Sequence, residues 1–142
     1  MTIPELNTKI QAFDLNAELG KIIQKNEKAI VEYNTEQLYA GFDSKGQNLS
    51  PEYTKKTIGI KQKKSPPQPT DRVTLKDTGD FYKGFKIEAK QNDFEIISTD
   101  EKAQGLKSKY GADIFGLAPE DRATVTDKIL NPQLTQALNE IL

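Results

Sequence analysis

Hydrophobic residues recur at steps of three and four between Asp14 and Leu38. This apolar stripe consists of Leu15, Leu19, Ile22, Ala29 and Tyr33, widened by Ile23 and Ile30. Such spacing places the side chains on one face of an α-helix. Asp14 is a suitable N-cap because its carboxylate accepts from the first free backbone N–H groups, and Gly41 is placed to end the helix. The pattern predicts a long N-terminal helix over about 14–40.

Asn26 interrupts the stripe where an aliphatic residue is expected. Two interpretations fit: a partly solvated edge of the helix, or a hydrogen-bonded side chain that sets the register against another subunit. Ahead of the stripe, Leu6, Ile10 and Phe13 have helical spacing. They predict a shorter helical lead-in that starts at Pro4.

Farther along, the period changes from about 3.6 to two. Apolar and polar residues alternate over 85–90 and 94–98, and the two runs are separated by Gln91-Asn92-Asp93. This pattern predicts an antiparallel β-hairpin over about 85–98. Ser98 and Glu101 have the spacing of a capping box for the next helix, which carries Ala103, Leu106 and Tyr110 and ends at Gly111.

Helical signals return at the C-terminal end of the sequence. Pro119 suits the first turn of a helix, where Glu120 and Asp121 complement the helix dipole. Asn131-Pro132 is expected to kink or restart this helix, which gives C-terminal helices over about 119–142. The sequence therefore predicts an α+β fold in a single domain, 1–142: a long N-terminal helix, a small antiparallel β-hairpin and C-terminal helices.

The segment between the first helix and the hairpin is polar and rich in proline. Ser50-Pro51 is a good N-cap and N1 pair for a short helix reaching about Thr57. Three prolines then predict a basic, extended loop over about 59–72 that projects from the domain, with lysines that resist burial. The candidate contact residues for a partner or DNA are Lys55, Lys56, Lys61, Lys63 and Lys64. These lysines fit either a solvated, mobile loop or a contact with phosphates or an acidic neighbour.

Composition limits the core that this chain can form. Of its 142 residues, 35% are hydrophobic and 29% are charged, and the mean hydropathy is −0.68. A chain of this length buries about 70% of its unfolded surface. So little apolar material favours an obligate oligomer that completes its core on a partner. The net charge of the whole chain is −1, but charge is unevenly distributed along it. Residues 51–64 have a net charge of +4, and residues 113–142 have a net charge of −3.

Cys and His are both absent from the sequence. Their absence excludes disulfides, thiolate chemistry, His-based nucleophile pairs and the commonest metal ligands. We predict no catalytic residues, no cofactor and no metal, and we expect that the protein is not an enzyme. No stretch approaches the ~20 apolar residues of a membrane span, and no signal-peptide pattern opens the chain. An untargeted intracellular protein without membrane contact is expected.

The triplet Asp77-Thr78-Gly79 also occurs around the catalytic aspartate of retroviral-type aspartic proteases. Those enzymes need two carboxylates that share one proton in a shielded floor. Here the charged residues Lys76 and Asp80 flank the triplet, and helical segments at both ends of the chain replace the strands of such a protease. We therefore interpret the triplet as structural. Asp77 or Thr78 caps a helical turn, Gly79 allows close backbone approach, and the core receives Phe81, Tyr82 and Phe85.

Four segments occur in the order GQNLSPEYTKKT, TLKDTGDFYKGF, KYGADIFGL and APEDRATVTDKIL. As an ordered set over roughly 41–130, they resemble the tailed-phage virion-morphogenesis (tail-completion, head–tail joining) family. The sequence departs from the family pattern at Ala112 and Asp113, where an Arg before the family's Phe-Leu-Gly-Leu motif is absent.

This resemblance implies a non-enzymatic structural protein of the virion, assembled in the cytoplasm of the bacterial host. The family likeness further implies a homo-oligomeric ring at the head–tail neck or tail end, with neighbouring neck, portal and tail proteins as partners. Non-specific contact with DNA in the channel is a further option. The alternative is a nucleic-acid-binding accessory protein that uses the basic loop 55–64.

Overall fold

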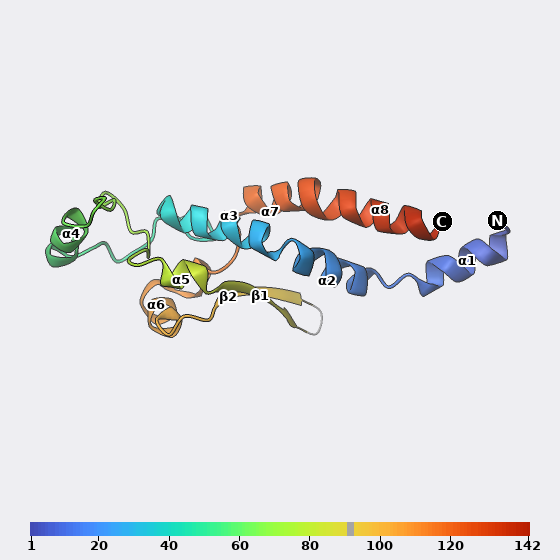
Figure 1. Cartoon of the computed structure of the whole chain (residues 1–142), viewed down its shortest axis with the longest axis horizontal. Helices are drawn as coiled ribbons and strands as arrows, with labels where there is room; N and C mark the ends of the chain where they lie inside the picture. The colour runs from blue at the N-terminus through green and yellow to red at the C-terminus, as the bar shows by residue number, and fades with distance from the viewer. Residues whose placement is uncertain (91–92) are drawn as a thin grey trace.

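The structure is a computed structural model that describes residues 1–90 and 93–142. Its elements are α1 (Ile3–Ala12), α2 (Leu15–Lys25), α3 (Glu27–Tyr39), α4 (Lys55–Gln62), α5 (Asp80–Lys83), β1 (Phe85–Lys90), β2 (Asp93–Ser98), α6 (Ala103–Tyr110), the 3-10 turn η1 (Ala112–Ile114), α7 (Pro119–Val125), the π-helical η2 (Thr126–Leu130) and α8 (Asn131–Ile141). The molecule is elongated, with α1 at one end and α4 at the other (Figure 1). The predicted α+β class is confirmed.

The predicted single long helix is wrong, because the chain breaks it at Asn26 into α2 and α3. The Asn26 side-chain amide donates to the carbonyl of Ile22 at 2.7 Å and to Gln133 Oε1 at 2.9 Å. Side-chain donation to a carbonyl one turn back competes with the helical backbone ladder, which explains the break. Asn26 is thus hydrogen-bonded, as one interpretation held, but its partner lies on α8 of the same chain. The lead-in helix α1 and the Asp14 cap are confirmed.

The C-terminal segments η2 and α8 run antiparallel to α2 and pack along it (Figure 1). Pro119 begins α7, as predicted, and a new helix begins at Asn131-Pro132. The five residues between these helices form a π-helical segment. Pro132 has no N–H for the carbonyl of Lys128, so a wider turn before the proline relieves the lost hydrogen bond and the ring clash.

The hairpin over 85–98 is confirmed, with antiparallel register from Phe85 opposite Ser98 to Lys90 opposite Asp93. The turn expected at Gln91-Asn92 lies outside the described residues. Helix α6 and its end at Gly111 are confirmed, but the predicted capping box is wrong. Ser98 instead donates its hydroxyl to the carbonyl of Phe81 at 2.8 Å, which fastens the end of β2 to α5.

The core lies where α3, the hairpin and the residues around α5 meet. Its buried members are Leu38, Leu49, Val73, Leu75, Phe81, Phe85 and Ile114. The Phe81 and Phe85 rings meet edge to face with centroids 5.0 Å apart, and Phe115 packs against both. This geometry is favourable for aromatic quadrupoles. The predicted burial of Phe81 and Phe85 is confirmed, and Tyr82 is half-buried beside them.

Two amide side chains on α3 hold the segment that leads from the core to α7. Asn34 donates to the carbonyl of Ile114 at 3.0 Å and accepts from the N–H of Gly116 at 2.8 Å. One turn later, Gln37 donates to the carbonyl of Gly116 at 3.0 Å and accepts from the N–H of Ala118 at 2.8 Å. We call this arrangement the amide clamp. It satisfies the backbone of an irregular buried segment without a neighbouring strand.

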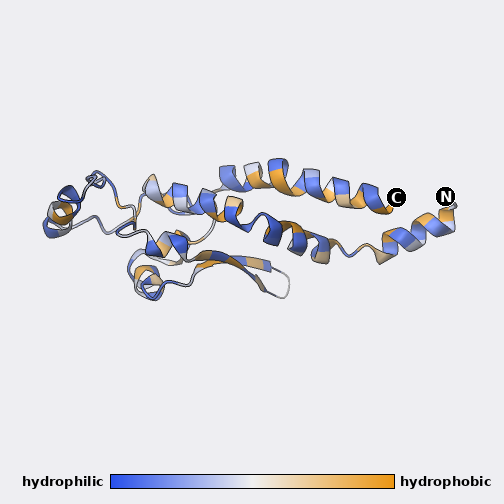
Figure 2. Ribbon diagram, viewed as in Figure 1, coloured by the Kyte–Doolittle hydropathy of each residue, from blue (hydrophilic) through white to orange (hydrophobic). Residues whose placement is uncertain are grey.

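Hydrophobic surface remains uncovered at the end of the molecule that carries α1. No residue of α1 is buried. Figure 2 shows apolar residues along both strands of the hairpin and also on α1, which lies away from the hairpin. Most of the large exposed hydrophobic side chains belong to this end, namely Met1, Ile3, Ile10, Leu15 and Leu142.

The amide clamp generates a prediction. Asn34→Asp replaces the side-chain donor with a carboxylate that faces the Ile114 carbonyl in a fully buried position. Burial and this carbonyl should raise the pKa of the new carboxyl, so the variant loses stability as pH rises through that pKa. We expect unfolding free energy to fall by about 3 kcal/mol or more at pH 7 and by much less at pH 4.

Urea unfolding at the two pH values measures this difference. Asn16→Asp, on the exposed surface of α2, is the matched control and should change little. An equal loss at both pH values in Asn34→Asp would contradict the role assigned to the clamp.

Candidate interaction surface

Residues 50–72, which we call the arm, project at the end of the molecule opposite α1 (Figure 1). The helix of the arm does not begin at Ser50-Pro51 and end near Thr57, as predicted. It begins after Thr54, whose hydroxyl accepts from the N–H of Thr57 at 3.2 Å, and it continues to Gln62. Residues 59–62 of the predicted loop are therefore helical.

Tyr53 joins the arm to the core. Its hydroxyl accepts from the N–H groups of Thr74 at 2.8 Å and Leu75 at 3.2 Å. Leu75 has a positive φ of 57°. This left-handed conformation costs a residue with a Cβ about 1–2 kcal/mol. On the other side of the same turn, Tyr82 donates its hydroxyl to the carbonyl of Thr74. The two tyrosines thereby hold a strained turn in place.

The two tyrosines differ in their ionisation. Burial tends to raise the pKa of the Tyr53 phenol, but hydrogen bonds from Thr74 and Leu75 and the charge of Lys61 outweigh it and hold the pKa below its ordinary value. Burial raises the pKa of Tyr82 far above the ordinary tyrosine range. These directions agree with the hydrogen bonds, in which the Tyr53 hydroxyl accepts from two N–H groups and the Tyr82 hydroxyl donates to a carbonyl.

Lys61 is buried, with 6% of its surface exposed, so the expectation that the loop lysines resist burial is wrong for this residue. Its ammonium donates to the carbonyl of Lys76 at 2.7 Å and to Gln68 Oε1 at 3.1 Å. It also lies 4.8 Å from the centre of the Tyr53 ring. Neutral oxygens and a π-face replace its hydration shell. Among the described residues, no carboxylate lies within ion-pair distance of Lys61.

The proline-rich part of the arm lies against the Asp77-Thr78-Gly79 triplet. Lys64 pairs with the Asp77 carboxylate at 2.8 Å, and Gln68 donates to the Asp77 carbonyl at 2.6 Å. The hydrogen bond from Lys64 lowers the pKa of Asp77. The Asp77 side chain is 60% exposed. An exposed, ion-paired carboxylate is unlike the shielded dyad of an aspartic protease.

The triplet itself forms a turn before α5. The predicted cap by Asp77 or Thr78 is wrong, because Gly79 occupies the N-cap position of α5 and no side chain caps this helix. The hydroxyl of Thr78 accepts from the N–H of Asp80 at 3.3 Å within the turn that precedes α5. Gly79 has a φ of 92°. A Cβ at Gly79 would have its nearest neighbours 4.0 Å away, so the positive φ, and not close packing, requires glycine.

The five predicted contact lysines thus form two groups. Lys61 and Lys64 hold the arm to the body. The other three, Lys55, Lys56 and Lys63, are exposed and form no ion pair within the described residues. These three side chains are available to a partner.

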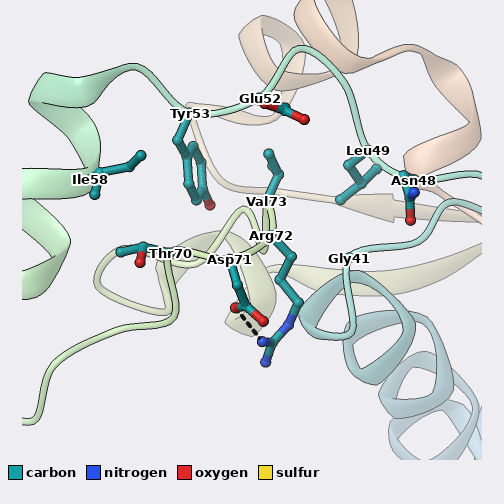
Figure 3. Close-up of a pocket in the computed structure, with 10 residues that line it drawn as sticks. All are labelled: Gly41, Asn48, Leu49, Glu52, Tyr53, Ile58, Thr70, Asp71, Arg72 and Val73. Atoms are coloured by element: carbon teal, nitrogen blue, oxygen red, sulfur yellow. Dashed lines mark hydrogen bonds and ion pairs between the residues drawn. The ribbon is translucent and has the colours of Figure 1, made fainter.

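A cavity of about 230 Å³ separates the arm from the end of α3. Figure 3 shows Tyr53 and Ile58 of the arm on one side and the Asp71–Arg72 ion pair on the other. Arg72 also donates to the carbonyl of Tyr39 at 2.7 Å and lies against its ring. Pockets for small ligands span about 300–1,000 Å³. This cavity is smaller, and two of its three charged residues, Asp71 and Arg72, pair with each other.

The described residues bring no cluster of three acidic side chains together that could hold a metal ion. Within 1–90 and 93–142, no helix is both long enough and apolar enough to cross a membrane. No protein-family model, curated protein or solved structure matches this chain.

Sequence reasoning missed Tyr53, Gln68 and Lys76 as parts of this surface. Tyr53 and Gln68 each contact residues close to the triplet, 9–22 positions along the chain. Neither residue belongs to a periodic pattern, so no local signal in the sequence marks these contacts.

Removal of one hydroxyl tests the attachment of the arm. Tyr53→Phe leaves the N–H groups of Thr74 and Leu75 without their acceptor, and we expect the free energy of unfolding to fall by about 1–3 kcal/mol. Tyr39→Phe is the matched control, because the Tyr39 hydroxyl forms no hydrogen bond within the described residues. Urea unfolding compares the two variants. Equal effects would contradict the anchoring role of Tyr53.

The Lys64–Asp77 pair has a defined pH dependence. Asp77→Asn should lower stability at pH 7 by about 1 kcal/mol at most, because the pair is largely exposed. The pKa of Asp77 in the folded state lies below its unfolded value of 3.8. The advantage of the wild type is therefore present above about pH 4 and disappears as pH falls through the folded pKa.

Urea unfolding of the wild type and Asp77→Asn at pH 7, 5 and 3 checks this dependence. The control is Asp127→Asn, which removes an exposed carboxylate that has no ion pair among the described residues. A difference for Asp77→Asn that grows toward low pH would show that the sign is wrong.

Proposed function

We propose that this chain is a structural protein of a tailed-bacteriophage virion, located at the head–tail neck or tail end, and that it acts by ring assembly. The observation that carries the proposal is the unpacked helix α1. It has ten residues, and none of them is buried. An isolated helix of this length is marginal in water. A helix that gains so little from its own chain needs a second surface to remain ordered.

The position of α1 favours a ring over a closed pair. Uncovered apolar side chains lie at the α1 end, whereas the arm and its exposed lysines lie at the other (Figure 1). A contact between two different ends is heterologous, and heterologous contacts form rings when the rotation closes. Residues 113–142 carry a net charge of −3 and residues 51–64 carry a net charge of +4. These opposite charges attract the two ends of neighbouring copies to each other.

The family resemblance supports the virion assignment. Its four segments occupy connected parts of the structure: the arm, the turn that anchors it with α5, the clamped segment after α6, and α7 with η2. The first two segments are in direct contact, because the Tyr53 hydroxyl accepts from the N–H of Thr74. The clamped segment reaches the same core through Ile114. The segments that carry the likeness therefore form one continuous unit.

A second candidate function is nucleic-acid binding through the arm, and the exposed Lys55, Lys56 and Lys63 favour it. Three phosphate contacts on duplex DNA correspond to a slope of about −3 in a plot of log affinity against log salt. Lys61 and Lys64 are engaged with the body and add little to such binding. Ring assembly accounts for α1 as well as the arm, and we prefer it for that reason.

Ring assembly is tested by charge placed on α1. The variant Ile3→Glu/Ile10→Glu puts carboxylates on its apolar side, and because both residues are exposed the fold of the monomer should persist. We expect the wild type to form oligomers in sedimentation velocity and rings in electron microscopy, and the variant to need at least about tenfold more protein to associate.

The matched control is Thr8→Glu/Gln11→Glu, which adds the same charge away from the stripe of α1. It should associate as the wild type does. A wild type that stays monomeric at every concentration, or an Ile3→Glu/Ile10→Glu variant that associates normally, would sink the proposal.

A further inference from the structure

A second hollow lies at the base of the arm, between α4, residues 75–81 and α6. Its volume is about 240 Å³. The floor is apolar and consists of Tyr53, Leu75, Phe81, Leu106 and Tyr110. The charged groups at its rim are Lys76, Asp77, Asp80 and Lys102, and the buried Lys61 also lines it. We call this hollow the lysine-rimmed groove.

The size of the groove indicates what enters it. Pockets that enclose a drug-sized ligand or cofactor have about 300–1,000 Å³. A groove of about 240 Å³ is better matched to one large side chain of a partner than to a nucleotide. Burial in the floor also raises the pKa of the Tyr110 phenol, because an apolar environment disfavours the charged form.

The charges around the groove leave an excess of positive charge. Lys64 already neutralises Asp77 at 2.8 Å. Lys76 and Lys102 are exposed, and Asp80 is the remaining carboxylate of the rim. The Lys61 ammonium is buried beside them, and its hydrogen-bond partners are neutral.

A buried cation without a counter-ion is costly in a medium of low dielectric constant. The cost falls when a carboxylate arrives from outside and closes over the same surface. The lysine-rimmed groove therefore gains from an anion and from an apolar group at the same time.

We propose that the lysine-rimmed groove binds a segment of a neighbouring protein in which one large aliphatic side chain lies directly beside acidic residues. The aliphatic side chain occupies the floor between Leu75 and Leu106, and the carboxylates meet Lys76 and Lys102. Duplex DNA is a poorer match, because a phosphate backbone engages the rim and leaves the apolar floor exposed to water. The inference rests on the proposed function only for the source of the segment.

A labelled peptide tests the groove directly. Fluorescence anisotropy with the fluorescein-labelled peptide GSEDLEDSG is measured on the full chain carrying Ile3→Glu/Ile10→Glu, so that ring formation does not influence the result. We expect saturable binding below about 1 mM. The peptides GSEDSEDSG, without the aliphatic side chain, and GSQNLQNSG, without the charges, should each bind at least tenfold more weakly.

Two charge reversals locate the peptide. Lys102→Glu, an exposed residue at the rim, should weaken binding at least tenfold, whereas Lys128→Glu, an exposed residue of η2, should leave it unchanged. Far-UV circular dichroism verifies that both variants are folded. Chemical shifts of the Leu106 and Leu75 methyl groups on peptide addition would place the aliphatic side chain on the floor.

Several outcomes overturn the inference. They are no saturable binding up to about 1 mM, equal binding of the peptide that lacks leucine, or equal effects of the two charge reversals. Displacement of the peptide by an unspecific duplex at low micromolar concentration assigns the rim to nucleic acid instead. Loss of self-association in Lys102→Glu, with no peptide binding to the wild-type groove, assigns it to a second copy of this chain. Rings that form normally without peptide binding contradict this inference and leave the proposed function intact.

Discussion

The amide clamp formed by Asn34 and Gln37 is the interaction on which the arrangement of the chain depends. Its four hydrogen bonds join α3 to residues 114–118, which are about 80 positions away in the sequence. The clamped segment places Ile114 in the core and then leads to α7. The C-terminal helical segment that begins with α7 can bring η2 and α8 against α2 only if its starting point is fixed here. Because Asn34 is fully buried, its amide groups have no water to replace a lost partner.

A second set of polar contacts, around the turn at Leu75, couples the arm to the same core. The left-handed backbone of Leu75 is unfavourable by itself. Tyr53 and Tyr82 hydrogen-bond the two sides of this turn, and Lys61 bonds the carbonyl of the next residue, Lys76. The side chain of Leu75 is buried in the core cluster. Burial of the Leu75 side chain therefore offsets the strain in its backbone. The arm supplies two of the polar groups that hold this turn, the Tyr53 hydroxyl and the Lys61 ammonium.

The sequence predicted the local elements well, because the signals for them lie within a few residues. Alternation defined the hairpin, Asp14 and Pro119 defined helix starts, and Gly111 defined a helix end. The break at Asn26 was missed, because its side chain takes its orientation partly from Gln133, 107 positions away.

Long-range contacts also explain why the candidate surface was predicted only in part. The lysine cluster was visible in the sequence, but the burial of Lys61 depends on Tyr53 and on a backbone carbonyl at Lys76. A carbonyl has no sequence signal of its own. The aliphatic and aromatic residues of the groove floor come from three separate segments, which no periodic pattern joins.

The two ends of the molecule differ in how they are held, and this difference is the physical basis for the assembly that we propose. At one end, hydrogen bonds and an ion pair fix the arm, so that its surface is formed before any partner arrives. At the other end, α1 has no buried residue, and Ile3 is 83% exposed. A preformed surface loses little entropy on binding, whereas a marginal helix gains order from it. A chain with one prepared end and one end that needs covering is suited to heterologous contacts, in which each copy completes the next.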